Sequence, residues 1–310
     1  YSYPLLKHHS AQITEAARNI SINYTGAILM VVTLGTFILS GLHLHGGEET
    51  FTSADAISYH VPMHLLFLAL LGLFIVVQYR SRVPFVDFRY FKHKYFSTAL
   101  YTNATFHLSM LAVVTLIPIV VENGLGKAPI FVTLVLLPNQ LLGLFLPTFA
   151  GWWYDRYNPR WLRPAAMMGI ALGFLLVGAF ASEVSWWGIP LLLLPTYIGS
   201  NLFNTANNAV VMNTLPESRT FASGMLETTR QMGHTLGTTI SATILGLALP
   251  FAIELLPVPE AQLAYRDGFR FSALAVVLII MSGSFVAAFQ RTSTDRQPRR
   301  AVAPQGSGDD

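Results

Sequence analysis

The sequence contains no cysteine and few charged residues. The absence of cysteine from all 310 positions excludes disulfides, thiolate metal ligands and cysteine nucleophiles. Charged residues make up 11% of the chain, less than half of the share of about 25% that is usual in soluble domains. The formal net charge of +3 is too small to indicate a nucleic-acid partner. Instead, 53% of the residues are hydrophobic and the mean hydropathy is +0.49, which predicts an integral membrane protein.

Long apolar segments recur along the chain and predict an all-α fold. A helix that crosses a bilayer needs about 20 mostly apolar residues. Eight segments meet this requirement: 22–42, 61–79, 96–121, 129–150, 164–182, 187–212, 220–250 and 268–290. The second is the weakest, because it begins with Val61, Pro62 and His64, and the seventh is polar in its first half. A large soluble helical core is a poor alternative, since it would need far more charged residues on its surface.

The loops between these segments differ in charge. Most of the 19 basic residues lie in the first 21 residues, in 80–95, in 151–163 and after residue 290. The alternate loops are acidic and include Glu48, Glu122, Glu183 and Glu254. Because cytoplasmic loops are enriched in lysine and arginine, both termini are predicted to be cytoplasmic. The expected location is a bacterial-type inner membrane, with 291–310 as a disordered cytoplasmic tail.

The stretch GWWYDRYNPR, residues 151–160, places charge between two apolar segments. It is predicted to form a tight cytoplasmic loop, in which an aspartate can face a helix N-terminus and an arginine can bind helix-end carbonyls. Pro159 stops a helix from continuing. The alternative is a basic anchor with aromatic residues at the membrane interface.

Three stretches resemble the major facilitator superfamily. Gly151, Asp155, Arg156 and Arg160 match the G-x-x-x-D-R-x-x-x-R/K core of its signature loop, although Asn158 stands where glycine is usual and Pro159 where a basic residue is usual. NTLPESRTFASGMLETTRQMGHTLGTTI (213–240) is similar to the fifth helix of the C-terminal half in the fourteen-helix drug:proton antiporter branch. RSRVPFVDFRYFKHKYF (80–96) resembles the basic loop before that half.

The resemblance implies a domain organisation and partners. It implies a cytoplasmic segment (1–21), two extra transmembrane helices (22–79), a basic cytoplasmic loop (80–95) and a six-helix bundle (96–290). The antiporter motif G-x-x-x-G-P-x-x-G-G does not occur, so the chain is expected to be a C-terminal fragment lacking the N-terminal half-bundle. The implied partners are a small-molecule substrate, protons, the lipid bilayer and the missing half-bundle. Neither a cofactor nor nucleic acid is implied, and the signature loop is expected to govern conformational gating.

Polar residues within the predicted seventh span are candidates for a proton or substrate pathway. Glu227, Arg230, Gln231 and His234 occupy adjoining helical faces. Ionisable residues at membrane depth are usually functional. The alternative is a structural ion pair between Glu227 and Arg230. Glu227 is the better proton carrier, because an arginine does not deprotonate.

Amides and one histidine mark two further spans. Asn201, Asn204, Thr205 and Asn208 form one stripe, which predicts either a cavity wall or interhelical hydrogen bonding. Asn103 and His107 share a helical face, and the resemblance favours an inward His107.

Smaller motifs predict helix shape and packing. Pro138, beside Asn139, predicts a kink. Gly233 and Gly237 predict close helix packing.

The remaining motifs separate the function classes. His60 and His64 provide two of the three or four ligands that a zinc site needs, so no metal site is predicted. An enzyme is not predicted either, because the sequence has no G-x-S-x-G motif or phosphate-binding loop. The leading hypothesis is a secondary active transporter that exports drug-like or amphipathic small molecules in exchange for protons. The alternative is a non-transporting membrane scaffold or remnant module that needs a partner chain.

Overall fold

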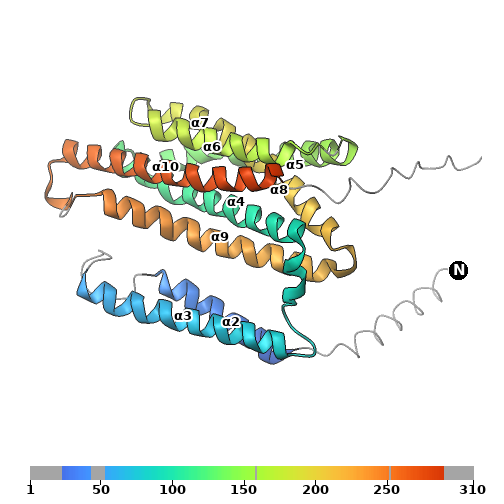
Figure 1. Ribbon diagram of the computed structural model, residues 1–310. Helices are drawn as coiled ribbons and strands as arrows, with labels where there is room; N and C mark the ends of the chain where they lie inside the picture. Colours follow the sequence, from blue (N-terminus) through green and yellow to red (C-terminus); the bar gives the residue numbers. More distant parts are fainter. Residues whose placement is uncertain (1–22, 43–52, 158, 251–252, 290–310) are drawn as a thin grey trace, which may run out of the picture. The chain divides into compact units, whose positions relative to one another are not determined.

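The computed structural model describes residues 23–42, 53–157, 159–250 and 253–289, and these ranges are helical and contain no strand (Figure 1). The prediction of an all-α membrane protein is confirmed. The chain divides into two compact units, residues 1–90 and 91–310, each of which is described separately below.

The first unit is a pair of helices, α2 (Tyr24–Ser40) and α3 (Ala54–Arg80). Asn23 caps α2 by accepting a hydrogen bond from the Gly26 amide at 2.8 Å. A Cβ at Gly26 would overlap the Gln78 side chain at 2.6 Å, so the lack of a side chain allows α2 to approach α3. At the far end, Nδ1 of His60 lies 2.8 Å from the Ser40 carbonyl oxygen.

The segment after α3 is held by the Gln78 side-chain oxygen, which accepts hydrogen bonds from the Phe85 and Val86 amides, and it carries one local ion pair. Arg89 donates to both carboxylate oxygens of Asp87, with the shortest contact at 2.7 Å. This charge-assisted hydrogen bonding lowers the pKa of the Asp87 carboxyl below its usual value. The short 3₁₀ helix η1 (Phe88–Lys92) follows.

The second unit contains the remaining helices. They are α4 (Lys94–Ile119), continued by a π-helical turn (Val120–Gly124), α5 (Ile130–Tyr157), α6 (Leu162–Phe180), the short α7 (Ile189–Leu192), α8 (Leu194–Thr214), α9 (Arg219–Ala248) and α10 (Val258–Phe289). The 3₁₀ turns Trp186–Gly188, Pro216–Ser218 and Ile253–Leu255 precede α7, α9 and α10 respectively.

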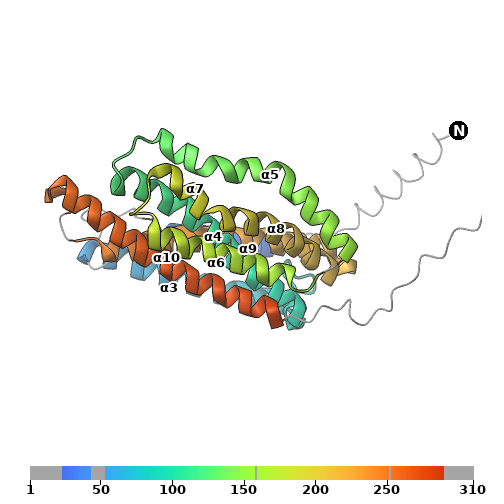
Figure 2. The ribbon, with the colours of Figure 1, turned by 90° about the horizontal axis from the view of Figure 1, so that it is seen from above.

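The core of the second unit lies among α4, α6, α8 and α10. Phe106, Met167, Phe203 and Ile280 are among its fully or almost fully buried side chains. α4 packs against α9 and α10, α6 against α8 and α10, and α5 against α8. Figure 2 shows α5 at one edge of the unit, where most of its length is exposed. This arrangement leaves α5 and one face of α9 as open surfaces of the unit.

Each of the eight predicted spans contains a helix. Within the described ranges, five helical segments are long and apolar enough to cross a membrane: α3, α4 with its π turn, α5, α6 and α10. α2 is apolar but has only 17 residues. α8 and α9 have sufficient length but more polar sequences. Polar residues inside a spanning helix need a partner other than lipid. The polar helices α8 and α9 are therefore candidates to line a binding site.

Two predicted boundaries are wrong. The expected continuous span 187–212 is divided into a 3₁₀ turn, α7 and α8, because Pro190 and Pro195 each start a new helix. The last helix begins at Val258, ten residues before the predicted start at residue 268. Hydropathy detects only the apolar part of a helix, and the first turns of α10 carry Glu260, Arg266 and Asp267.

Candidate functional site

A polar cavity of about 320 Å³ opens between α4, α5 and α8 of the second unit. Its hydrophobic wall includes Phe106, Met110 and Val113 of α4. Its polar lining comes from all three helices: His107, Asn139, Thr196, Tyr197, Ser200, Asn201, Asn204 and Thr205. We call this space the polar cavity. Ligand sites in proteins are typically apolar clefts of about 300–1,000 Å³ with a few polar groups, and the polar cavity fits this description.

The local sequence of α5 and α8 explains why amides line the cavity. Pro138 lies within α5, where it removes one helical hydrogen bond next to Asn139. Asn201 donates to the Tyr197 carbonyl at 2.8 Å and lies 3.5 Å from the Asn139 side-chain oxygen. The Tyr197 hydroxyl donates to the Val135 carbonyl at 2.9 Å, which joins α8 to α5.

Two cavity-lining residues, Asn204 and His107, each carry a buried polar atom with no partner among the described residues. The side-chain oxygen of Asn204 is buried and accepts no hydrogen bond from any described residue. A buried acceptor without a donor is unfavourable by about 1–3 kcal/mol. Such a group in a cavity wall is therefore available to a ligand or to water.

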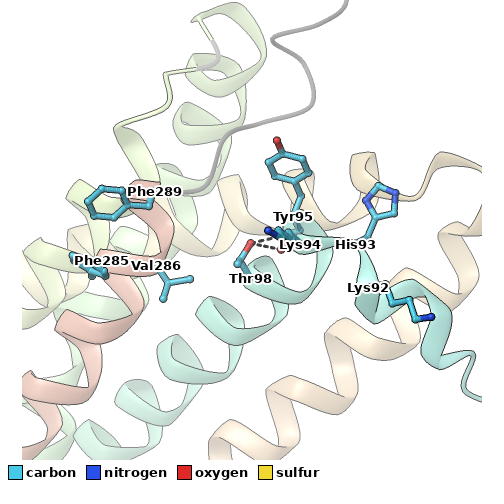
Figure 3. A pocket seen from close by; sticks show the side chains of 8 residues that line it. All are labelled: Lys92, His93, Lys94, Tyr95, Thr98, Phe285, Val286 and Phe289. Carbon is cyan, nitrogen blue, oxygen red and sulfur yellow. Dashed lines mark hydrogen bonds between the residues drawn. The ribbon is translucent and has the colours of Figure 1, made fainter.

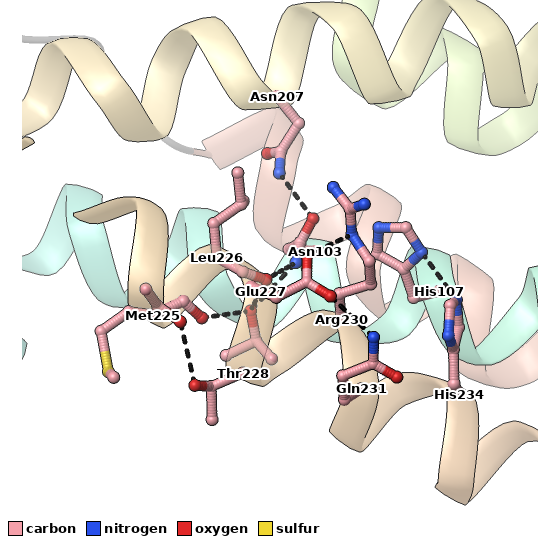
Figure 4. A network of polar contacts seen from close by, with 12 residues as sticks. Asn103, His107, Asn207, Met225, Leu226, Glu227, Thr228, Arg230, Gln231 and His234 are labelled. Atoms are coloured by element: carbon pink, nitrogen blue, oxygen red, sulfur yellow. Dashed lines mark hydrogen bonds and ion pairs between the residues drawn. The ribbon is translucent and has the colours of Figure 1, made fainter. Parts of the chain in front are cut away.

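A chain of hydrogen bonds beside the cavity joins four helices. Arg163 at the start of α6 donates to the Thr102 hydroxyl at 3.0 Å. Thr102 donates to the Asn207 side-chain oxygen at 3.3 Å, and Asn207 donates to Asn103 at 3.4 Å. Asn103 then donates to the Leu226 carbonyl oxygen of α9 at 3.0 Å (Figure 4). Because Asn103 and Asn207 are fully buried and paired with each other, this chain holds α4, α6, α8 and α9 together rather than exposing polar groups.

A histidine pair lies between the cavity and the open face of α9. Nδ1 of His107 lies 3.2 Å from Nε2 of His234, and the two rings meet edge to face at 78° (Figure 4). His107 also lines the polar cavity, and its Nε2 atom is buried with no described partner. The charged groups nearest this pair are Arg230 and Glu227 of α9. Histidine can both donate and accept protons near neutral pH.

Glu227, Arg230 and Gln231 form a small polar group on α9. Gln231 donates to one carboxylate oxygen of Glu227 at 2.6 Å, and Nε of Arg230 lies 3.4 Å from the other. The side chains of Glu227 and Arg230 are 53% and 31% exposed, so this ion pair is partly exposed, and its structural role and the pathway role both stay predictions. Glu227 and Gln231 are exposed on the open face of α9, and Arg230 is half-buried beside them.

The predicted glycine face of α9 packs against α4. A Cβ at Gly233 would contact the Ala104 carbonyl oxygen, and one at Gly237 would overlap the Leu108 carbonyl oxygen. The absence of both side chains allows the backbones of α4 and α9 to touch, which confirms the packing interpretation. The same close approach brings His234 to His107.

The segment 151–160 is helical for most of its length, and the prediction of a loop there is wrong. α5 continues through Gly151, Asp155 and Arg156 and ends at Tyr157, since Pro159 is the first residue that opposes a helix. Gly151 is not at a turn, and a Cβ there would meet Thr205 at an ordinary 3.7 Å.

The charged side chains at this end of α5 are exposed. Asp155, Arg156 and Arg160 all face outward. Arg156 lies 6.0 Å from the Tyr157 ring centroid, and Asp155 makes no hydrogen bond or ion pair within the described ranges. Trp153 and Trp161 stack edge to face nearby, as expected for an aromatic belt at a membrane interface.

The structure thus separates the predicted site residues into groups. His107, Asn201 and Asn204 meet in the polar cavity, whereas Asn103 belongs to the buried hydrogen-bond chain. Asn208 does not line the cavity, although its side-chain oxygen is also buried without a described partner. His60 and His64 lie in the first unit, and no group of three metal-binding side chains occurs in the described ranges.

Several residues outside the predicted set belong to these arrangements, among them Asn139 and Arg163. Asn139, which sequence reasoning linked only to a kink, lines the cavity. Arg163, counted with the loop charges, is 5% exposed and starts the buried chain. The position of Asn139 next to a mid-span proline could have indicated its role, whereas only tertiary packing reveals the role of Arg163.

Comparison with known proteins agrees with this arrangement. The sequence profile of the Major Facilitator Superfamily matches residues 13–238. The chain is 25% identical to the uncharacterized MFS-type transporter YhcA of Bacillus subtilis, over 73% of this chain and 42% of that protein. It is 26% identical to the lincomycin resistance protein LmrB of Listeria monocytogenes, over 68% of this chain and 46% of that protein. It is 24% identical to the multidrug resistance protein Stp of Mycobacterium tuberculosis, over 86% of this chain and 47% of that protein. The chain therefore spans less than half the length of these relatives.

The long apolar helices define a multi-pass membrane protein. The chain belongs to the Major Facilitator Superfamily, whose members are transporters rather than enzymes. The predicted family is confirmed.

Proposed function

We propose that this chain forms part of a secondary active transporter that exports amphipathic small molecules and is driven by protons. The observation that carries the proposal is the polar cavity, with His107, Asn139, Asn201 and Asn204 facing one space among apolar side chains. An apolar wall suits the hydrophobic part of such a molecule, and the amides suit its polar groups. The drug-resistance names of two relatives, LmrB and Stp, support this choice of substrate class.

The geometry supports a proton route beside the substrate cavity. His107 lines the cavity and contacts His234, and Glu227 lies on the open face of the same helix as His234. A proton that enters at Glu227 could pass to the histidine pair and reach the cavity without crossing the apolar core. Protonation of His107 would then change the charge of the polar cavity. This change would couple the movement of the proton to the movement of the substrate.

The open face of α9 supports a further part of the proposal. Because Glu227 and Gln231 are exposed at membrane depth, they need water or another protein surface beside them. We propose that a second helical bundle faces them, as the family resemblance implies, and that the two bundles rock about the cavity. Asp155 and Arg156 at the end of α5 would contact that bundle and bias the conformational equilibrium.

The proposed setting is a bacterial inner membrane, with both termini in the cytoplasm. The basic segments 80–95 and 151–163 would face the cytoplasm because of the bias in lysine and arginine. Residues 22–79 would be the two additional helices of a fourteen-helix transporter. The proposed domain boundaries are otherwise those expected from the sequence.

The proposal is tested by transport in inverted membrane vesicles. The gene is expressed with its flanking reading frame intact, and uptake of the amphipathic dye Hoechst 33342 is followed after a proton gradient is imposed. We expect uptake that stops when a protonophore removes the gradient. Uptake equal to that of vesicles without the protein, or unaffected by the protonophore, would contradict proton-driven export and favour the alternative of a non-transporting membrane module.

A further inference from the structure

A second hollow of the second unit lies at one end of α4 and α10, away from the polar cavity. It has a volume of about 600 Å³ and is lined by Lys92, His93, Lys94, Tyr95, Thr98, Phe285, Val286 and Phe289. Figure 3 shows the three apolar side chains on α10 and the basic and polar ones on the start of α4 and the turn before it. We call this hollow the basic groove.

The two walls of the basic groove differ in chemistry. On α10, Phe285 and Phe289 are 66% and 72% exposed, although this helix is apolar enough to span a membrane. On the other wall, Lys92 and Lys94 are exposed, and neither forms an ion pair with a described residue. None of the eight lining residues is acidic. The groove therefore offers an apolar surface directly beside unneutralised positive charge.

The inner end of the groove is closed. The Tyr101 hydroxyl lies 2.8 Å from the Ser282 hydroxyl, which joins α4 and α10 about one helical turn beyond Thr98 and Phe285. A ligand can thus lie along α10 from its last turn and cannot pass further between the two helices. The opening of the groove remains at the end of the bundle that carries the basic segment.

We propose that the basic groove binds an anionic phospholipid of the surrounding bilayer. One acyl chain would lie against Phe285, Val286 and Phe289, and the headgroup phosphate would contact Lys92 and Lys94. Basic pockets between transmembrane helices are suited to anionic headgroups, because each lysine near the membrane surface attracts negative charge. A zwitterionic lipid is disfavoured because its ammonium group would lie beside the lysines. The groove shares no residue with the polar cavity, so this proposal is independent of the proposed function.

The proposal is tested with purified, delipidated protein in neutral detergent. Binding of palmitoyl-oleoyl phosphatidylglycerol and of the matching phosphatidylcholine is measured by native mass spectrometry. We expect the glycerol lipid to bind at least tenfold more tightly than the choline lipid. Replacing Lys92→Gln together with Lys94→Gln should reduce its affinity by about tenfold and leave the choline lipid unchanged. An excess of inorganic phosphate should not displace the lipid.

Matched controls separate the groove from general electrostatic attraction and from misfolding. Arg80→Gln with Arg82→Gln removes the same charge from exposed positions outside the groove, and should change the affinity by less than twofold. Val286→Trp should fill the groove and reduce binding with both lysines present, whereas Leu278→Trp, at an exposed position deeper on α10, should not. Equal losses in the two charge variants, retained binding in Val286→Trp, or displacement by phosphate would each overturn the proposal.

Discussion

Nδ1 of His107 lies 3.2 Å from Nε2 of His234, and this contact joins the wall of the polar cavity to α9. The two helices can approach so closely because Gly233 and Gly237 present no side chain to α4. The same packing that stabilises the bundle therefore brings together two imidazole side chains, each of which has one ring nitrogen that can accept a proton. The predictions below test the cavity, the histidine pair and the packing that positions them.

The first prediction concerns the histidine pair. His234→Gln keeps a hydrogen-bonding side chain beside His107 but cannot carry a proton, so we expect normal folding and a loss of proton-driven dye uptake. Uptake should also depend less steeply on pH, because glutamine has no group that titrates. The measurement is initial uptake in inverted vesicles at several pH values. His64→Gln, at an exposed position of the first unit, is the control, and a parental pH profile in His234→Gln would contradict the role.

The second prediction concerns Glu227. Because the Glu227–Arg230 pair is substantially exposed, Glu227→Gln should change the free energy of unfolding by no more than about 1 kcal/mol. If Glu227 is the proton entry point, the variant should still exchange substrate down its gradient but should not concentrate it. Expression, thermal stability and uptake are compared for Glu227→Gln, Arg230→Gln and the double variant. A Glu227→Gln protein that still concentrates dye would rule out the coupling role.

The third prediction concerns the contact between α4 and α9. A Cβ at Gly237 overlaps the Leu108 carbonyl oxygen, so Gly237→Ala should force the helices apart and destabilise the protein by about 1–3 kcal/mol. Gly246→Ala on the same helix is the control, because a Cβ there meets no atom within 4 Å. Alanine is the better helix former, so this control should be neutral or slightly stabilising. Thermal unfolding in detergent distinguishes the two, and equal effects would contradict the packing account.

The fourth prediction concerns orientation in the membrane. The bias in lysine and arginine places 80–95, 151–163 and 213–219 in the cytoplasm, and 43–58, 122–128, 183–186 and 252–267 outside. The protein has no cysteine, so single cysteines can be introduced without removing any. A membrane-impermeant maleimide should label Cys replacements of Glu122 and Glu183 in intact cells. If a cysteine at position 155, in place of Asp155, were labelled from outside, the predicted orientation would be contradicted.

For the described ranges, the sequence predicted where helical segments lie better than it predicted where each helix begins and ends. A run of about 20 apolar residues is needed to cross a bilayer, so the spans are visible in composition alone. The continuation of α5 to Tyr157 could not be seen in the composition, because Asp155 and Arg156 are compatible with both a helix and a turn. Likewise, Pro190 and Pro195 were not recognised as dividing one apolar run into two helices.

The direction in which each polar side chain points could not be predicted from spacing. Asn204 and Asn207 are three residues apart on α8, yet Asn204 lines the cavity and Asn207 is buried against Asn103. A stripe on one helix identifies a shared face, but the neighbour of that face depends on how the other helices pack. For the same reason Arg163 looked like a loop charge, whereas its contact with Thr102 of α4 buries it.

Asn204 and Asn208 provide the most direct test of the polar cavity as the substrate site. Both lie on α8, and both carry a buried side-chain oxygen with no described partner, but only Asn204 lines the cavity. Leucine has a similar shape and removes the unpaired acceptor, so neither Asn204→Leu nor Asn208→Leu should lower the stability. The two variants therefore differ in their position relative to the cavity rather than in their chemistry.

The decisive measurement is equilibrium binding of Hoechst 33342 to the purified protein, the Asn204→Leu variant and the Asn208→Leu variant. We predict that Asn204→Leu weakens binding by about tenfold, the loss expected when about 1.4 kcal/mol of hydrogen bonding is removed, while Asn208→Leu binds like the parent. Parental binding by Asn204→Leu, or an equal loss in both variants, would contradict the assignment of the polar cavity as the substrate site.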